Sequence, residues 1–160
     1  MDGLQIKIYN SVSQEWEWQY AYDVFGIMMG DGFLDALKEP VPLKPFVENQ
    51  SRLIDGKRVV VNNPRKDSRS VDLIFDISGT TPADFEAKKD AFLALLYQGE
   101  IVLGFPGQEK WSQDKLPGIP PTTDKFHLIY QNKVTYSQDL TQTGCKMAVR
   151  FEEPNPANRT

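Results

Sequence analysis

One pattern constrains this chain more than any other: an alternating apolar segment followed closely by a capped amphipathic segment. Residues 71–77 place Val, Leu, Phe and Ile at every second position, the period of a β-strand with one buried face. Shortly afterwards Thr81 offers a side-chain oxygen for a helix N-cap, and Pro82 suits the first helical position. The sequence therefore predicts a strand, a short connection and a helix from about Thr81 to Gln98.

The predicted helix has one apolar face, which carries Phe85, Phe92 and Leu96. We expect this face to pack on the apolar side of the neighbouring strands. Gly99 follows the helix at a natural C-terminal stop. The predicted core consists of Leu73, Phe75, Ile77, Phe85, Phe92, Leu96, Val149 and Phe151.

Further alternating or β-rich segments predict strands along most of the chain. They are residues 4–9, 20–27, 57–61, 101–105, 126–130, 134–136 and 145–152. The proline-rich segments 40–49 and 106–123 predict long surface loops. One helix among six to eight strands with turn-like connections indicates an antiparallel α+β domain.

Composition places the chain in the ordinary globular range. Its 160 residues are 40% hydrophobic and 25% charged, which predicts a single domain over residues 1–153 and a mobile tail over 154–160. We expect a soluble, unsecreted protein, since no run of 18 apolar residues and no signal-like start occur. A single cysteine cannot form an internal disulfide, and one cysteine with one histidine supplies too few ligands for a zinc ribbon. The net charge of −4 argues against a dedicated nucleic-acid binder.

A nucleophilic set of Cys145, His127 and either Asp124 or Asp139 is formally possible. Cys145, however, is in phase with the apolar residues of its strand, and a buried thiol behaves as a small hydrophobe. His127 alternates against apolar neighbours and is predicted to lie on the solvated face of its strand. Packing is therefore the favoured role for Cys145, and solvation for His127.

Neither paired carboxylates nor nucleotide-binding motifs indicate a functional site more strongly than this nucleophilic set does. Asp72 and Asp76 share one face of one strand, but four residues separate them by roughly 13 Å, too far to share a proton. The glycines of residues 26–32 predict a turn rather than a phosphate cradle. We predict no catalytic residues, no metal site and no cofactor.

A cationic segment stands out against the acidic chain. Residues 57–69 carry a local charge of +4, which leaves −8 for the remainder. The segment is either the solvated tip of a hairpin at residues 62–68, or a contact that orients subunits head to tail. On the second interpretation Arg65, Lys66 and Arg69 are the candidate subunit interface.

Four aromatic side chains alternate with polar or small residues near the N-terminus: Trp16, Trp18, Tyr20 and Tyr22. Aromatic residues are enriched both in cores and at protein interfaces. The strip is therefore either core lining or an interface anchor.

The order of these elements resembles the distal tail protein and tail-tube family of long-tailed bacteriophages. The likeness covers most of the chain, without a diagnostic signature. It is carried by the strand 69–79, the helix 84–96, the strand 101–103, the returning strands 126–130 and 134–136, the closing strand 146–152 with Glu153-Pro154-Asn155-Pro156, and the entry segments 22–27 and 54–56.

The resemblance implies an α+β fold with an antiparallel β-sandwich or split β-barrel, one flanking helix and long loops or hairpin arms. It implies a non-enzymatic virion tail component, assembled in the host cytoplasm, whose copies form a ring, typically a hexamer, around the DNA channel. The expected partners are further copies and other tail proteins, with no sequence-specific DNA binding and no membrane. Many distal tail proteins carry a second, carbohydrate-binding-like domain, for which 160 residues leave no room. This favours a tube or tail-tip ring over a hub.

Two other function classes stay open. One is a small cytoplasmic ligand-binding or hydrolytic α+β protein with a site under the 106–123 loop. The other is a chaperone or regulatory module that binds an extended peptide at an open sheet edge.

Overall fold

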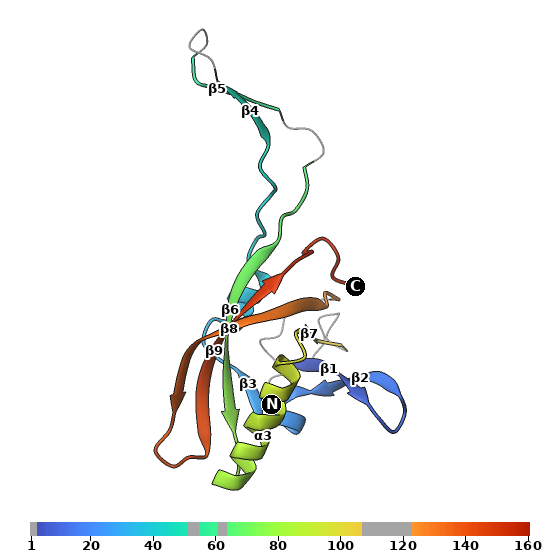
Figure 1. Cartoon of the computed structure of the whole chain (residues 1–160), viewed down its shortest axis with the longest axis vertical. Coiled ribbons are helices and arrows are strands. Elements are labelled where there is room, and N and C mark those ends of the chain that lie inside the picture. The colour runs from blue at the N-terminus through green and yellow to red at the C-terminus, as the bar shows by residue number, and fades with distance from the viewer. Residues whose placement is uncertain (1–2, 51–54, 61–63, 107–122) are drawn as a thin grey trace, which may run out of the picture.

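A computed structural model describes residues 3–50, 55–60, 64–106 and 123–160 (Figure 1). Its main element is a seven-stranded sheet with the strand order β2-β1-β7-β8-β9-β6-β3, in which all neighbours are antiparallel. The strands are β1 (Gln5–Asn10), β2 (Glu15–Tyr20), β3 (Ile27–Met29), β6 (Arg69–Ser78), β7 (Glu100–Gly104), β8 (Phe126–Gln138) and β9 (Gly144–Glu153). The sheet is open, with β2 and β3 at its edges, so the predicted antiparallel α+β class is confirmed and the described strands do not close a barrel.

The predicted helix is present as α3 (Pro82–Leu96). The side chain of Thr81 accepts a hydrogen bond from the backbone N–H of Asp84 at 3.1 Å, as an N-cap residue does. Phe85, Phe92 and Leu96 are fully buried against the sheet. The backbone of Gly99 leaves the helix with a φ of 102°, a conformation that favours glycine.

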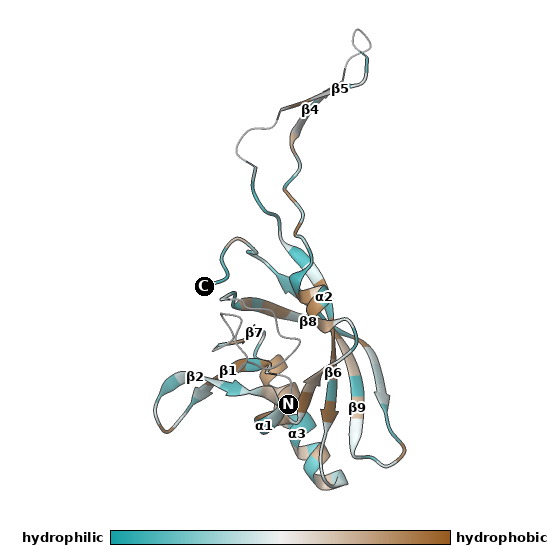
Figure 2. Cartoon of the chain, turned by 180° about the vertical axis from the view of Figure 1, so that it is seen from behind, coloured by the Kyte–Doolittle hydropathy of each residue, from teal (hydrophilic) through white to brown (hydrophobic). Residues whose placement is uncertain are grey.

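The core lies between α3, two shorter helices and one face of the sheet. Ten residue pairs join β6 to β9 without a break, among them Leu73 with Val149 and Val71 with Phe151. Every member of the predicted core is buried. Figure 2 shows strongly hydrophobic colouring along β6 and α2 (Phe33–Lys38), which meet through Phe33 and Phe75 with ring centroids 5.3 Å apart.

The predicted strand over residues 20–27 is wrong in most of its length. Residues Ala21–Phe25 form the helix α1, and only Ile27 continues into β3. Ala21 and Phe25, four residues apart, are the buried residues of this one-turn helix. Gly26 ends it in the left-handed conformation (φ 65°), and its N–H bonds the carbonyl of Tyr22.

A two-stranded arm projects away from the body (Figure 1). It consists of β4 (Val47–Gln50) and β5 (Lys57–Val60), paired antiparallel, so part of the predicted loop 40–49 is a strand. β5 pairs with β4 and not with β6, so the prediction of a hairpin tip at residues 62–68 is wrong. Residues 64–67 instead form the stem, where the N–H of Lys44 bonds the Arg65 carbonyl and the N–H of Asp67 bonds the Pro42 carbonyl.

The segments 126–130 and 134–136, predicted as separate strands, belong to the single strand β8. Its pairing with β9 shifts register between Tyr130 and Asn132 and again between Lys133 and Thr135, as β-bulges do. The turn that joins β8 to β9 and the tip of the β1–β2 hairpin lie on opposite sides of the body in both views (Figures 1 and 2). In the part of the chain that the structure describes, no helix is long and apolar enough to cross a membrane.

Candidate interaction surfaces

Arg65, Lys66 and Arg69, predicted together as a subunit interface, differ in their exposure. Arg65 and Lys66 are exposed on the stem of the arm. Arg69 is the first residue of β6, and its side chain is only 4% exposed because it pairs with Glu153 on the neighbouring strand. Arg69 is therefore committed to contacts within its own chain, which leaves Arg65 and Lys66 as the exposed cations of the proposed set.

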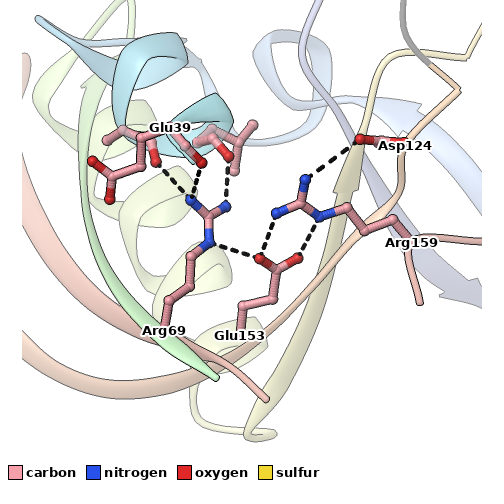
Figure 3. A network of polar contacts seen from close by, with 7 residues as sticks. Glu39, Arg69, Asp124, Glu153 and Arg159 are labelled. Atoms are coloured by element: carbon pink, nitrogen blue, oxygen red, sulfur yellow. Dashed lines mark hydrogen bonds and ion pairs between the residues drawn. The ribbon is translucent and has the colours of Figure 1, made fainter. Parts of the chain in front are cut away.

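Arg69 sits in a buried polar network (Figure 3). Its Nε donates to a carboxylate oxygen of Glu153 at 2.7 Å. Its other nitrogens donate to the carbonyl oxygens of Ala36, Leu37 and Glu39 at the end of α2. These carbonyls have no partner within the helix, so a cation at this end satisfies them and is favoured by the helix dipole.

Arg159 completes the network from the C-terminal segment. Its guanidinium binds both oxygens of Glu153 at 2.9 and 3.0 Å, lies 3.5 Å from Asp124, and covers the ring of Phe126 at 4.8 Å. Pro156 is also buried. The segment 154–160, for which the sequence predicts mobility, is thus anchored to the body in this structure, through a buried acid that no local pattern marks.

Glu153 is the centre of the network, and its side chain is 1% exposed. Burial alone disfavours its charged form, but the hydrogen bonds from Arg159 and Arg69 outweigh that effect and hold the pKa of this carboxyl below its ordinary value. A carboxylate between two arginines is the arrangement that makes a buried charge tolerable. The network joins β6, β9, α2 and the C-terminal segment.

The candidate nucleophilic set is not assembled. Cys145 is buried on the core side of β9, and burial raises the pKa of its thiol. His127 lies near the other end of β8, eleven residues from the Gln138 that pairs with Cys145, a separation on the order of 30 Å. Its ring nitrogens contact Glu100 at 3.2 Å and the Thr160 carbonyl at 3.0 Å.

The carboxylates of β6 do not form a dyad. Asp72 is held by Arg150 of β9 through two contacts of 2.9 and 3.2 Å, and these hydrogen bonds lower its pKa. Asp76 lies four residues along the same strand, opposite Lys146. Among the described residues no group of three or more His, Cys, Asp or Glu side chains could hold a metal ion. Of the loop 106–123, proposed to cover a ligand site, residues 107–122 lie outside the described residues.

The aromatic strip near the N-terminus divides between two elements: Trp16, Trp18 and Tyr20 lie on β2, and Tyr22 lies on α1. In the β1–β2 hairpin Tyr9 lies opposite Trp16, and their rings meet edge to face with centroids 5.6 Å apart. These side chains are 49% and 57% exposed, so the pair is not core lining. Val12 in the connecting turn is 93% exposed. Exposed aromatic pairs of this kind are typical of protein interfaces.

A groove of about 380 Å³ runs between α3 and the β8–β9 hairpin. Leu93 and Tyr97 line it from the helix side, and Tyr130 and Tyr136 from β8. Tyr97 and Tyr130 meet edge to face at 5.9 Å. Lys89 and Lys133 stand beside it, and the Lys89 ammonium lies 3.4 Å from the Tyr136 hydroxyl.

Comparison with solved structures shows a shared fold. The structure of the Dit protein (gp 19.1) of SPP1, described as a paradigm of the hub adsorption apparatus in phages that infect Gram-positive bacteria, superposes with a TM-score of 0.51 at 11% sequence identity. The match covers 96% of this chain and 50% of that one, so the chain spans half the length of Dit. At this coarse level the fold agrees with the predicted resemblance to phage tail proteins. No family model matches the chain, and no curated protein matches it.

Proposed function

We propose that this chain is a structural, non-enzymatic subunit of a bacteriophage or prophage tail. Its copies assemble with one another into a ring, a hexamer by the predicted resemblance, at the tail tube or the tail tip. Other tail proteins bind the ring, and DNA passes through it without sequence-specific contacts. A hub position is a further candidate, because the chain shares its fold with a hub protein.

The projecting arm is the observation that carries this proposal. A two-stranded ribbon has no core of its own and is at best marginally stable in water. The arm nevertheless extends from the body as β4 and β5, linked to it by a paired stem (Figure 1). A surface on a neighbouring subunit would cover it and supply the missing packing.

The positive charge on the stem of the arm favours an acidic surface of the neighbouring copy as its partner. Arg65 and Lys66 are both exposed, in a chain whose net charge is −4. Acidic groups on the next copy would attract them, and a contact between two different patches repeats around a ring. Exposed charge pairs are weak and screened by salt, so they set orientation while apolar contacts supply most of the affinity.

Sedimentation velocity over a protein-concentration series tests the assembly. We expect the parent chain to form multimers as concentration rises. The double variant Arg65→Glu/Lys66→Glu should associate several-fold more weakly at low ionic strength, with a smaller difference at high salt. A matched control, Lys38→Glu/Lys146→Glu, changes the net charge equally on the body of the molecule.

The outcomes separate the parts of the proposal. A parent chain that stays monomeric at every concentration contradicts self-assembly. Multimers that the arm variant forms as readily as the parent remove Arg65 and Lys66 from the interface. An equal loss in the control variant would assign the effect to net charge instead of the arm.

A further inference from the structure

We propose that the tip of the β1–β2 hairpin of one copy docks into the groove between α3 and the β8–β9 hairpin of the next copy. This inference rests on the proposed self-assembly and names a second pair of surfaces for it. The occupant of the groove is thus a segment of a second copy of this chain.

The hairpin presents an apolar tip that is fixed before binding. Trp16 and Tyr9 hold each other edge to face, and Val12 projects from the turn. The side-chain oxygen of Asn10 accepts hydrogen bonds from the backbone N–H groups of Val12 and Ser13, which fixes the turn. A preorganised tip loses little entropy on binding, and Trp and Tyr are the residue types most often found as interface anchors.

The groove matches the tip in chemistry. Tyr97 is 69% exposed at one wall, and Tyr136 is 40% exposed at the other. Between them the floor is apolar, with Leu93, Met147 and Val149 among its lining residues. Its volume of about 380 Å³ falls within the roughly 300–1,000 Å³ of sites that enclose a compact apolar group. Aromatic walls also suit the edge of an incoming indole ring.

Charge complements the apolar contact. Glu15, which precedes Trp16 on β2, is exposed on the hairpin. Lys133 is exposed beside the groove, where Lys89 is already paired with Glu86 at 3.0 Å, so Lys133 is the cation available to the tip. An acidic tip entering a groove with Lys133 at its margin fixes the orientation of the docked hairpin.

The positions of the two surfaces allow the contact to repeat. The tip of the β1–β2 hairpin extends away from α3 and the β8–β9 pair (Figure 1), and the groove lies between these last elements. One chain can therefore offer its tip to one neighbour and its groove to another. Such a contact is heterologous, the type from which closed rings form. It is separate from the arm, which projects in a third direction.

Charge reversal and its rescue test the docking. We expect Glu15→Lys and Lys133→Glu each to weaken association several-fold in low salt, measured by sedimentation velocity. The double variant Glu15→Lys/Lys133→Glu restores the pair with opposite signs, and should recover most of the parent association. Trp16→Ala should weaken association at least tenfold at any salt concentration, because it removes the anchor. Glu152→Lys, on β9, is the matched control for a reversed acid.

Each result decides the inference. Parent multimers together with unaffected Trp16→Ala, Glu15→Lys and Lys133→Glu variants overturn the hairpin docking and leave the proposed function standing. Two weakened single variants without recovery in the double variant overturn the pairing of Glu15 with Lys133. A monomeric parent overturns both the docking and the proposed assembly. Circular dichroism and a urea titration of each variant confirm that a weakened association is not a loss of fold.

Discussion

At the scale of single residues, Phe92 is one of the side chains through which α3 packs on the sheet. It is fully buried, and its ring lies 5.1 Å from that of Phe75 and 5.7 Å from that of Phe25, centroid to centroid. Phe92→Ala would leave a cavity between the helix and the sheet. We expect the free energy of unfolding to fall by about 3–5 kcal/mol, measured by urea titration.

Leu140→Ala is the control for this experiment, because Leu140 is fully exposed in the β8–β9 turn. That variant should change the free energy of unfolding by less than about 0.5 kcal/mol. A loss below about 1 kcal/mol for Phe92→Ala would mean that α3 does not pack through this face.

The lowered pKa of Glu153 predicts how the stability of the fold changes in acid. Its folded-state pKa is lower than in the unfolded chain, so the network is at full strength at neutral pH, above the unfolded pKa of about 4.3. As the pH falls below that value towards the folded pKa, the unfolded chain takes up the proton first and the stabilisation is lost. Glu153→Gln should therefore lower stability at pH 7 and show a shallower further loss between about pH 5 and pH 3.

The neighbouring acid Glu152 supplies the comparison for this pH profile. It points to the opposite face of β9, since successive residues of a strand alternate. Urea titrations of Glu152→Gln across the same pH range should retain the acid response of the parent. An identical pH profile for the parent and Glu153→Gln would show that the carboxylate of Glu153 has no part in acid stability.

At the scale of elements, the end of α1 depends on a glycine. Gly26 has a φ of 65°, and a Cβ atom added there would lie 2.1 Å from the carbonyl oxygen of Ser78 in β6. Gly26→Ala therefore combines backbone strain with a clash against a strand of the core. We expect the thermal midpoint to fall by several degrees, measured by circular dichroism.

Gly32 separates these two effects. Its φ of 70° is nearly the same, but no atom lies within 4 Å of the position of an added Cβ. Gly32→Ala should therefore show the cost of strain alone and a smaller fall in the thermal midpoint. Equal losses in the two variants would mean that the chain around Ser78 relaxes to accept the side chain.

Elements with a strong local signal could be predicted, and those fixed by distant contacts could not. The alternation of residues 71–77 and the cap at Thr81 fix β6 and α3 locally, and both are confirmed. Residues 21–25 carry the pattern of a strand, yet they form a helix because Ala21 and Phe25 reach the core together. A five-residue helix has little propensity of its own, so tertiary packing decides it.

At the scale of the whole molecule, the charged residues also divide into those that a local pattern marks and those whose partners are fixed by distant contacts. Sequence spacing marks Arg65, Lys66 and Arg69 as one cationic group, but the partner of Arg69 lies 84 residues away at Glu153. Only the pairing of β6 with β9 brings these two side chains together. Likewise, the groove beside Tyr97 is formed jointly by α3, β8 and β9, and no local pattern indicates it.

The burial of Cys145 also makes the chain a convenient background for spectroscopy. It is the single cysteine of the sequence and is 7% exposed, within the paired region of β6 and β9. A maleimide dye or spin label added to the native protein would react slowly there. A cysteine introduced at Val12 or at Leu43 would carry the label almost alone, so distances between copies could be read from either site without replacing a native residue of the core.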